Sequence, residues 1–175
     1  GGIAYILERD YGFDLPKPMR EEVGYMMKGI SDKAHKELSS QEIFDAFSKE
    51  YINYFDPIDI TDATFKKVST YKSDDGMIVD MRVDIGGDIF EVTAEGNGRL
   101  NAINNALKKT PYHFDYTEHA LETSSSSKAA AYICIEDSEG VQYWGVGTHD
   151  DIILASVNAL VSALNRENRM HKFVK

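Results

Sequence analysis

The sequence predicts an α+β fold in which a helical segment precedes a duplicated βββα unit with pseudo-twofold symmetry. Up to about residue 60, apolar residues recur every three or four positions, as they do on one face of a helix. Beyond residue 60 they alternate or form short runs between Gly, Asp and Ser residues, as in strands joined by tight turns. The order of three strands and one helix then occurs twice, which indicates an internal repeat.

The first expected helix covers residues 16–28. Two prolines near its start suit the first turn of a helix, where a missing amide hydrogen is tolerated. Spacings of three and four residues place the apolar side chains of this segment on one face. These side chains are Met19, Val23, Met26, Met27 and Ile30.

A second helix is expected over residues 41–52, and its start carries a capping-box pattern. The Ser39 hydroxyl and the Glu42 carboxylate can each accept a hydrogen bond from an amide that a helix start leaves unpaired. The side chains expected to be buried are Ile43, Phe44, Phe47 and Tyr51. Residues 54–59 break the helical pattern and are interpreted as a linker, so we place a helical linker subdomain over residues 1–60 and a second domain over 61–175.

The first βββα module is expected over about residues 61–109. Its strands are predicted at 65–72, 77–85 and 88–94, because these segments alternate or run apolar between turn residues. The turns contain Asp and Gly, which tolerate the backbone conformations of tight hairpins. A helix over 100–108 closes the module.

The second module is expected over about residues 110–170, with the same order of elements. Strands are predicted at 112–121, 129–136 and 141–147, and a closing helix at 150–165. This helix and the helix of the first module both contain the tripeptide Asn-Ala-Leu. The shared tripeptide and the repeated order together favour a duplication.

Each module is expected to place two glycines between its third strand and its helix. The pairs are Gly96 with Gly98 and Gly145 with Gly147. A glycine-rich turn before a helix exposes backbone amides to an anion, and the helix dipole adds to the attraction. The alternative is that these glycines only form tight turns, and the sequence leaves both interpretations open.

Composition and charge exclude several classes of protein. With 175 residues, 42% of them hydrophobic, the chain has enough apolar material for a core. A net charge of −10 without a basic cluster argues against nucleic acids and anionic membranes as partners. The single Cys134 cannot form an internal disulfide, and no leader or membrane-spanning run is recognisable, so we expect a cytoplasmic protein.

No set of residues in the sequence suggests catalysis or metal binding. The five histidines do not occur in a spacing typical of metal sites. Cys134 lies in an apolar run and is interpreted as a small buried hydrophobic residue. We therefore assign no catalytic residue, cofactor or metal to this chain.

Several motifs, spread over nearly the whole chain, resemble the C-terminal part of the 2-isopropylmalate synthase family. The chain opens without an initiator Met, as expected of a piece of a longer polypeptide. The motifs are Gly-Gly-Ile-Ala-Tyr at 1–5, Asp-Leu-Pro at 14–16, Gly-Asn-Gly at 96–98, Asp-Tyr-Thr-Glu-His-Ala at 115–120, Ala-Ala-Ala-Tyr at 129–132, Trp-Gly-Val-Gly at 144–147, Ala-Ser at 155–156 and Ser-Ala-Leu-Asn-Arg at 162–166.

This resemblance implies a regulatory function. Enzymes of this family condense acetyl-CoA with 2-oxoisovalerate in the first committed step of leucine biosynthesis, and their metal-dependent TIM barrel would lie upstream of this chain. The divalent metal and the catalytic residues would belong to that barrel. The resemblance implies that residues from about 61 onward bind L-leucine for feedback inhibition and help to form a homodimer.

The resemblance also implies an effector pocket between the two modules. Backbone amides would meet the leucine carboxylate, small residues would leave room, and apolar residues would contact the branched side chain. By motif position the pocket residues are Gly96, Asn97, Gly98, Leu100, Asn101, His113, Tyr116, Ala120, Ala129 and Ile152. The chain departs from the family pattern at Arg99, where proline is usual, at Asn101, where alanine is common, and at His113, where an apolar residue is usual.

Three alternatives to a leucine-binding regulator are open at this point. The chain could be the related regulator of citramalate synthase, which senses isoleucine. It could be a dimerisation module without a ligand, which the departures at Asn101 and His113 would suit. It could also be an independent enzyme, although the sequence shows no catalytic set.

Overall fold

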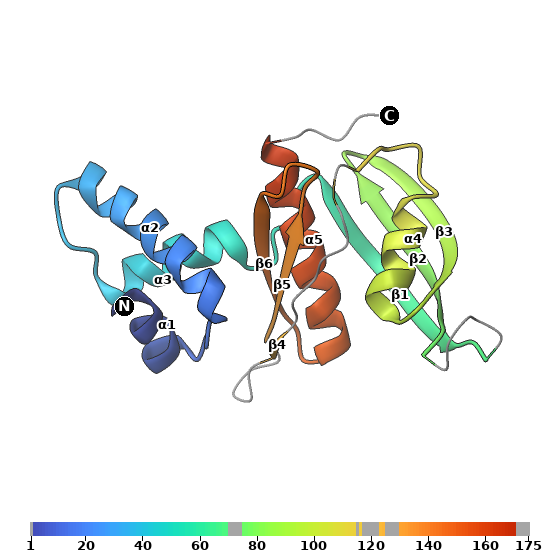
Figure 1. Cartoon of the computed structure of the whole chain (residues 1–175), viewed down its shortest axis with the longest axis horizontal. Helices are drawn as coiled ribbons and strands as arrows, with labels where there is room; N and C mark the ends of the chain where they lie inside the picture. The colour runs from blue at the N-terminus through green and yellow to red at the C-terminus, as the bar shows by residue number, and fades with distance from the viewer. Residues whose placement is uncertain (1, 70–74, 115, 117–122, 125–129, 171–175) are drawn as a thin grey trace.

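The protein is a mixed α/β chain with three helices at one end and two small antiparallel sheets beside them (Figure 1). The structure is a computed structural model that describes residues 2–69, 75–114, 116, 123–124 and 130–170. The order of elements is compatible with two βββα units. Their pseudo-twofold symmetry and the domain boundary near residue 60 stay predictions.

The first three helices form a helical arm. They are α1 (Gly2–Tyr11), α2 (Lys17–Ala34) and α3 (Ser40–Tyr51). Helix α1 was not predicted from the sequence; it is ten residues long, and Leu7 is its one buried residue. In α2 the burial of Met19, Val23 and Met27 is confirmed, whereas Ile30 is exposed.

The predicted capping box at the start of α3 is confirmed. The Glu42 amide donates to the Ser39 hydroxyl at 3.1 Å, and the Ser39 amide donates to the Glu42 carboxylate at 3.0 Å. The ammonium of Lys36 lies 2.7 Å from the same carboxylate, and its hydrogen bond is the main reason that the pKa of Glu42 falls to about 2. Local sequence therefore determines where α3 begins.

The first sheet has the order β1 (Ile58–Lys67), β2 (Met77–Ile85), β3 (Asp88–Gly96), and α4 (Arg99–Leu107) follows it. The predicted start of the first strand at residue 65 is wrong, because β1 begins at Ile58 within the expected linker. The side chain of Asn165 explains this early start. It accepts from the Ile58 amide at 2.9 Å and donates to the Ile58 carbonyl at 2.9 Å.

The second sheet has the order β4 (Thr123–Ser124), β5 (Ala130–Glu136), β6 (Gln142–Thr148), and α5 (Ile152–Met170) follows it. The strand predicted at 112–121 is not found where the structure describes that segment. There the Tyr112 hydroxyl donates to the Asp88 carboxylate at 2.7 Å and so ties the chain to β3. Residues 115 and 117–121 lie outside the described residues, as do 70–72 and Ala129.

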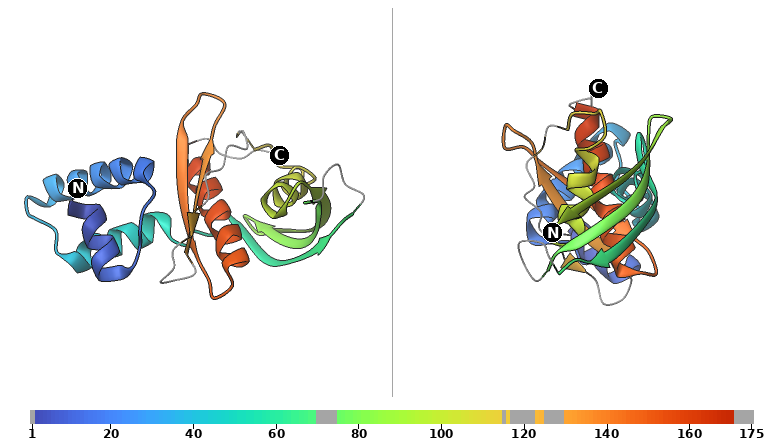
Figure 2. Two further views of the ribbon diagram at one scale, coloured as in Figure 1. Left: turned by 60° about the horizontal axis from the view of Figure 1, so that its bottom comes forward. Right: turned by 90° about the vertical axis from the view of Figure 1, so that its right-hand side faces the viewer.

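Strands β5 and β6 are buried on both faces of their sheet. Ala131, Ile133 and Ile135 contribute to one apolar core with α5, α4 and the first sheet. The alternate residues Tyr132 and Cys134 contribute to a second core with the helical arm. Figure 2 shows this sheet standing between the arm and α5. Because both sides of β5 are covered, its residues are apolar without interruption from 130 to 135.

Helix α5 lies directly on two glycines of β6. A Cβ atom at Gly145 would come within 2.2 Å of the Ala159 carbonyl oxygen, and one at Gly147 within 1.8 Å of the Ala155 carbonyl oxygen. Both glycines lie inside β6, so the expectation that they lie between the third strand and the helix is wrong. Gly96 and Gly98 do lie where β3 leads into α4. Gly145 and Gly147 instead allow α5 to pack closely on β6.

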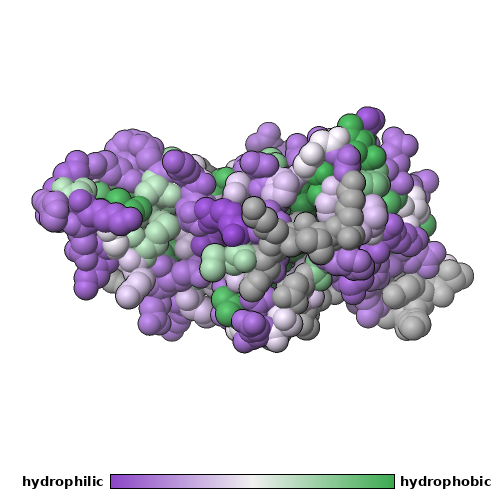
Figure 3. Space-filling view, turned by 90° about the horizontal axis from the view of Figure 1, so that it is seen from above, coloured by the Kyte–Doolittle hydropathy of each residue, from purple (hydrophilic) through white to green (hydrophobic). Residues whose placement is uncertain are grey.

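Hydrophilic residues cover most of the surface seen from above (Figure 3). Apolar areas lie over the helical arm and over the end formed by the first sheet and α4. In the part of the chain that the structure describes, the helices are too short or too polar to span a membrane.

Replacing Gly147 with alanine is expected to destabilise the fold. The added methyl group would overlap the backbone of α5, and overpacking of this kind costs about 1–3 kcal/mol. Urea unfolding followed by circular dichroism measures the change in the free energy of unfolding. Gly29→Ala is the control, because it lies in α2 with no atom within 4 Å of the added Cβ, and we expect it to stabilise by about 0.5–1 kcal/mol. Equal effects of the two substitutions would contradict this role of Gly147.

Candidate functional site

The turn between β3 and α4 contains two glycines with different structural roles. Gly98 precedes the helix with φ +135°, a conformation that side chains other than glycine rarely adopt. Gly96 lies against the helix, because a Cβ there would come within 2.4 Å of the Ala102 nitrogen. The Asn97 amide donates to the Asn101 side chain at 2.8 Å, which holds the turn against the first turn of α4.

The start of α4 carries positive charge and no capping side chain. Gly98 cannot cap the helix, and the first turn contains no acidic residue. The amides of a first helical turn and the helix dipole both favour an anion at this position. Arg99, the first residue of α4, adds a guanidinium group.

A small hollow lies between the starts of α4 and α5. Its volume is about 280 Å³, near the lower limit for small-molecule sites. Its lining residues are Arg99, Leu100, Ile152, Ile153 and Ser156. Ile152 is 40% exposed and Ser156 is buried, so the hollow combines an accessible aliphatic wall with one hydroxyl group. Apolar side chains beside a cationic helix start can accommodate a carboxylate that bears an aliphatic chain.

The sequence from residue 37 to 167 matches the model of the LeuA allosteric (dimerisation) domain. The chain belongs to this family. It is also similar to proteins named 2-isopropylmalate synthase, with 43% identity to that of Desulfitobacterium hafniense, 42% to that of Helicobacter hepaticus and 38% to that of Clostridium acetobutylicum. These alignments cover 94%, 95% and 95% of the chain and 29%, 31% and 30% of the relatives. The chain therefore spans about 30% of the length of the relatives it matches.

The structure of this LeuA-family chain brings together two of the ten predicted pocket residues in the hollow itself, Leu100 and Ile152. Four others form the adjoining turn and first helical turn: Gly96, Asn97, Gly98 and Asn101. The Tyr116 hydroxyl donates to the side chain of Asn104, one helical turn beyond Leu100.

Of the three remaining predicted pocket residues, the structure describes one. His113 is exposed and does not line the hollow. Ala120 and Ala129 lie outside the described residues. Their assignment to a leucine site stays a prediction.

Sequence reasoning missed three residues that line the hollow, namely Arg99, Ile153 and Ser156. The sequence did single out Arg99, because it departs from the family pattern directly after the Gly-Asn-Gly turn. Ser156 lies one helical turn after Ile152 and donates to its carbonyl oxygen at 3.2 Å. The helical spacing alone predicts that these two share a face, but not that the face meets α4.

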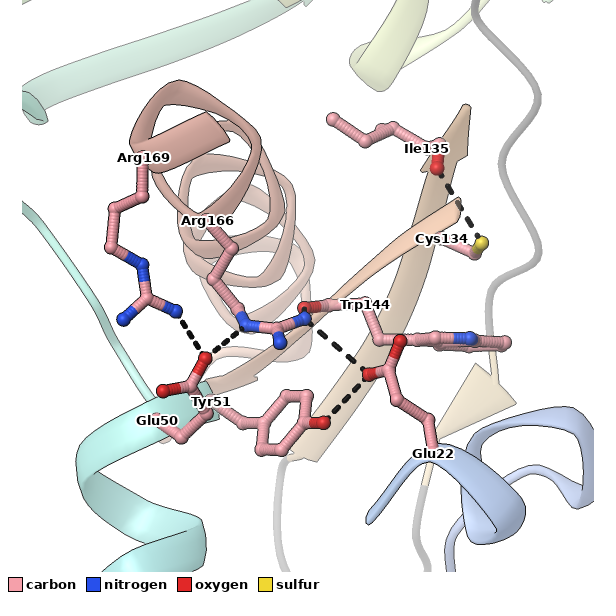
Figure 4. Close-up of polar contacts among 8 residues, drawn as sticks. All are labelled: Glu22, Glu50, Tyr51, Cys134, Ile135, Trp144, Arg166 and Arg169. Carbon is pink, nitrogen blue, oxygen red and sulfur yellow. Dashed lines mark hydrogen bonds and ion pairs between the residues drawn. The ribbon is translucent and has the colours of Figure 1, made fainter. Parts of the chain in front are cut away.

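The other end of α5 is joined to the helical arm through Arg166 (Figure 4). This guanidinium donates to the Glu50 carboxylate at 2.8 Å and to the Trp144 carbonyl at 2.9 Å, and it lies 3.4 Å from the Glu22 carboxylate. It also stacks over the ring of Tyr51, 4.2 Å from the centroid. These contacts connect α2, α3, β6 and α5 at one point, which we call the Arg166 junction.

The charges at the Arg166 junction are balanced. Arg169 forms a second ion pair with Glu50. Burial alone raises the pKa of Glu50, but the hydrogen bonds from Arg169 and Arg166 outweigh it, so the pKa ends below its ordinary value. Glu50 therefore stays ionised when the arm is in place.

Cys134 is buried, as the sequence predicts, and its thiol donates to the Ile135 carbonyl across 3.7 Å. Burial is the main cause that raises the pKa of this thiol to about 11, so the thiolate is scarce at neutral pH. No group of three or more His, Cys, Asp or Glu side chains in the described ranges is placed to hold a metal ion.

The Glu50→Gln variant is expected to be less stable than the wild type at pH 7, by about 1 kcal/mol after allowance for partial exposure. Because the pKa of Glu50 is lower in the folded than in the unfolded state, its contribution is complete above the ordinary value of 4.5 and is lost as the pH falls through the folded value. The two proteins should therefore converge in unfolding free energy as the pH falls below 4.5. Denaturant unfolding across this pH range measures the difference.

Glu91→Gln is the matched control for this experiment. Glu91 is 79% exposed at the side chain and lies 3.9 Å from Arg82, so its loss should change stability by less than about 0.5 kcal/mol. A Glu50→Gln effect that is equally small, or independent of pH, would show that the junction does not hold the arm.

Proposed function

We propose that this chain is the regulatory part of a 2-isopropylmalate synthase, that it binds L-leucine for feedback inhibition, and that it forms a homodimer. The family description names both allostery and dimerisation, and the relatives carry the enzyme's name. The observation that carries the leucine proposal is the hollow, in which Leu100 of α4 and Ile152 of α5 lie beside an uncapped helix start.

The catalytic activity belongs, in this proposal, to the part of the protein that the chain does not span. Condensation of acetyl-CoA with 2-oxoisovalerate, and the divalent metal ion that assists it, would be located in a barrel outside these residues. The role of this chain is to change the activity of that barrel when leucine is abundant. The buried thiol of Cys134 suits a reducing cytoplasm as the place of action.

Helix α5 provides a physical connection for this regulation. Its start lines the hollow and its last turns form the Arg166 junction, about 21 Å away at the rise of an α-helix. Leucine would favour the arrangement of α4 and α5 that it binds more tightly, and the shift would reach the arm through the junction. The size of the effect is limited by the difference in leucine affinity between the two arrangements.

Leucine binding is expected to be saturable and to be weaker with L-isoleucine or L-valine. Isothermal titration calorimetry of the purified chain with each amino acid tests this expectation. Gly98→Asp should weaken leucine binding about tenfold or more, because it adds a like charge and backbone strain at the helix start. Gly87→Asp is the control, because it adds the same negative charge at another glycine with a positive φ. Gly87 has φ +98° and lies in the turn between β2 and β3, away from the hollow.

Two results would replace the leucine proposal by an alternative. A preference for isoleucine would favour the regulator of citramalate synthase. Absence of heat with all three amino acids would favour a dimerisation module without a ligand. If the Gly98→Asp variant binds leucine as tightly as the Gly87→Asp variant does, leucine binds elsewhere.

The dimer is expected to form in the purified chain. The inner face of the first sheet leaves Ile60, Phe65 and Val92 only partly buried, and this apolar area is available to a partner. Sedimentation equilibrium should give twice the chain mass of 19.7 kDa. A mass of one chain at every concentration measured would contradict the proposal that this part dimerises by itself.

A further inference from the structure

Strand β1 lies at an edge of the first sheet and pairs with β2 on one side only. The Val68 amide donates to the Gly76 carbonyl at 2.9 Å, which fixes the direction of the backbone groups before it. Because these groups alternate along an antiparallel strand, those of Ala63, Phe65 and Lys67 face away from β2. Within the described part of the chain they have no hydrogen-bond partner. Residues 62–67 therefore form a free edge.

Other strand edges of this structure are covered by asparagine side chains or backbone. Asn105 donates to the Glu95 carbonyl on the edge of β3 at 2.8 Å. The Asn53 amide donates to the Val146 carbonyl on the edge of β6 at 2.9 Å. Asn165 covers the start of β1 in the same way, but its reach ends before the irregularity that follows Ile60 in the pairing of β1 with β2. An edge left open is a template for a strand of another chain.

Residues 62–66 are complementary to a second copy of themselves. In an antiparallel pair with Thr64 opposite its own equivalent, Asp62 lies opposite Lys66 of the partner subunit. The backbone groups of Ala63 and Phe65 then face each other and exchange hydrogen bonds. Asp62 and Lys66 are exposed, and the described residues include no ion-pair partner for either. Opposite charges and Thr–Thr pairs placed directly across two strands are both favourable, and the twofold axis makes each charge pair occur twice.

The charges select this register over its neighbours. With Phe65 opposite its own equivalent, Lys66 would lie opposite Thr64 and Asp62 opposite Val68, so neither charge would be paired. A lysine on an edge strand discourages pairing unless an opposite charge meets it. The apolar face agrees with the same register, because Ala63 and Phe65 are partly buried beside the first core and a partner strand would extend the cover over them.

We propose that β1 pairs antiparallel with β1 of a second copy of this chain over residues 62–66, so that two three-stranded sheets become one continuous sheet. This inference rests on the proposed homodimer and adds to it the interface and its register. A second copy is the partner because the sequence of charges on β1 is complementary to itself. The twofold arrangement also uses up both free edges, so association ends at the dimer.

Charge reversal tests the register. Asp62→Lys and Lys66→Asp should each raise the Kd of the dimer about tenfold, because two attractive pairs become repulsive. One variant lowers the net negative charge of the chain and the other raises it, so a general charge effect would move the two in opposite directions. Sedimentation equilibrium over a range of concentrations measures the Kd.

Mixing the two variants gives the sharper result. Each lysine of the Asp62→Lys variant lies opposite an aspartate of the Lys66→Asp variant in this register, so the mixture should dimerise about as tightly as the wild type. Glu95→Lys is the control, since it makes the same change of charge on an exposed residue of β3, and its dimer Kd should equal that of the wild type. A mixture that dimerises no better than the separate variants would overturn the proposal.

A backbone substitution tests the pairing independently of charge. Ala63→Pro removes an amide hydrogen that faces the free edge and none that faces β2, and proline is tolerated on edge strands. The variant should keep the circular dichroism spectrum of the wild type and raise the dimer Kd about tenfold or more. An unchanged Kd would contradict strand pairing at this position.

Failure of this inference can be told apart from failure of the proposed homodimer. If the wild type dimerises and the substitutions at Asp62, Ala63 and Lys66 leave its Kd unchanged, the homodimer stands and its interface lies elsewhere. If the wild type has the mass of one chain at every concentration, the homodimer and this interface are both overturned. Leucine binding is measured separately by calorimetry and does not depend on either outcome.

Discussion

The sheet of β5 and β6 has no face left for solvent, and the rest of the structure depends on this constraint. One face carries α5 and shares its core with the first sheet, and the other face carries the helical arm. Removing either layer would expose the apolar residues of a whole sheet face, at roughly 25 cal/mol for each Å². The arm and the regulatory part are therefore held together by burial as well as by the polar contacts of Arg166.

Close packing of α5 on Gly145 and Gly147 determines where the two ends of this helix lie. A helix that touches the strand backbone has little freedom to rotate or slide, because any side chain at the contact would collide with it. One end of α5 is then held beside α4, where the hollow forms, and the other end beside α2 and α3. The proposed binding site at one end and the attachment of the arm at the other thus involve a single rigid element.

Electrostatics at the two ends of α5 follow opposite patterns. At the Arg166 junction two arginines meet two carboxylates, so the charges are satisfied within the fold. At the hollow the positive charge of Arg99 has no such partner among the described residues. A balanced group of partly buried charges stabilises a contact between elements, whereas the guanidinium of Arg99 is exposed to water.

By itself, the sequence determined the features that depend on neighbouring residues. Helical spacing predicted α2 and α3, the Ser39 and Glu42 pair predicted the start of α3, and turn residues predicted β2 and β3. Only the tertiary structure decided the start of β1, because Asn165, more than a hundred residues away in sequence, binds the backbone of Ile58. It also decided that Gly145 and Gly147 serve packing and that Leu100 and Ile152 line one hollow. The approach of two distant elements depends on the shapes of both and leaves no periodic pattern in the sequence.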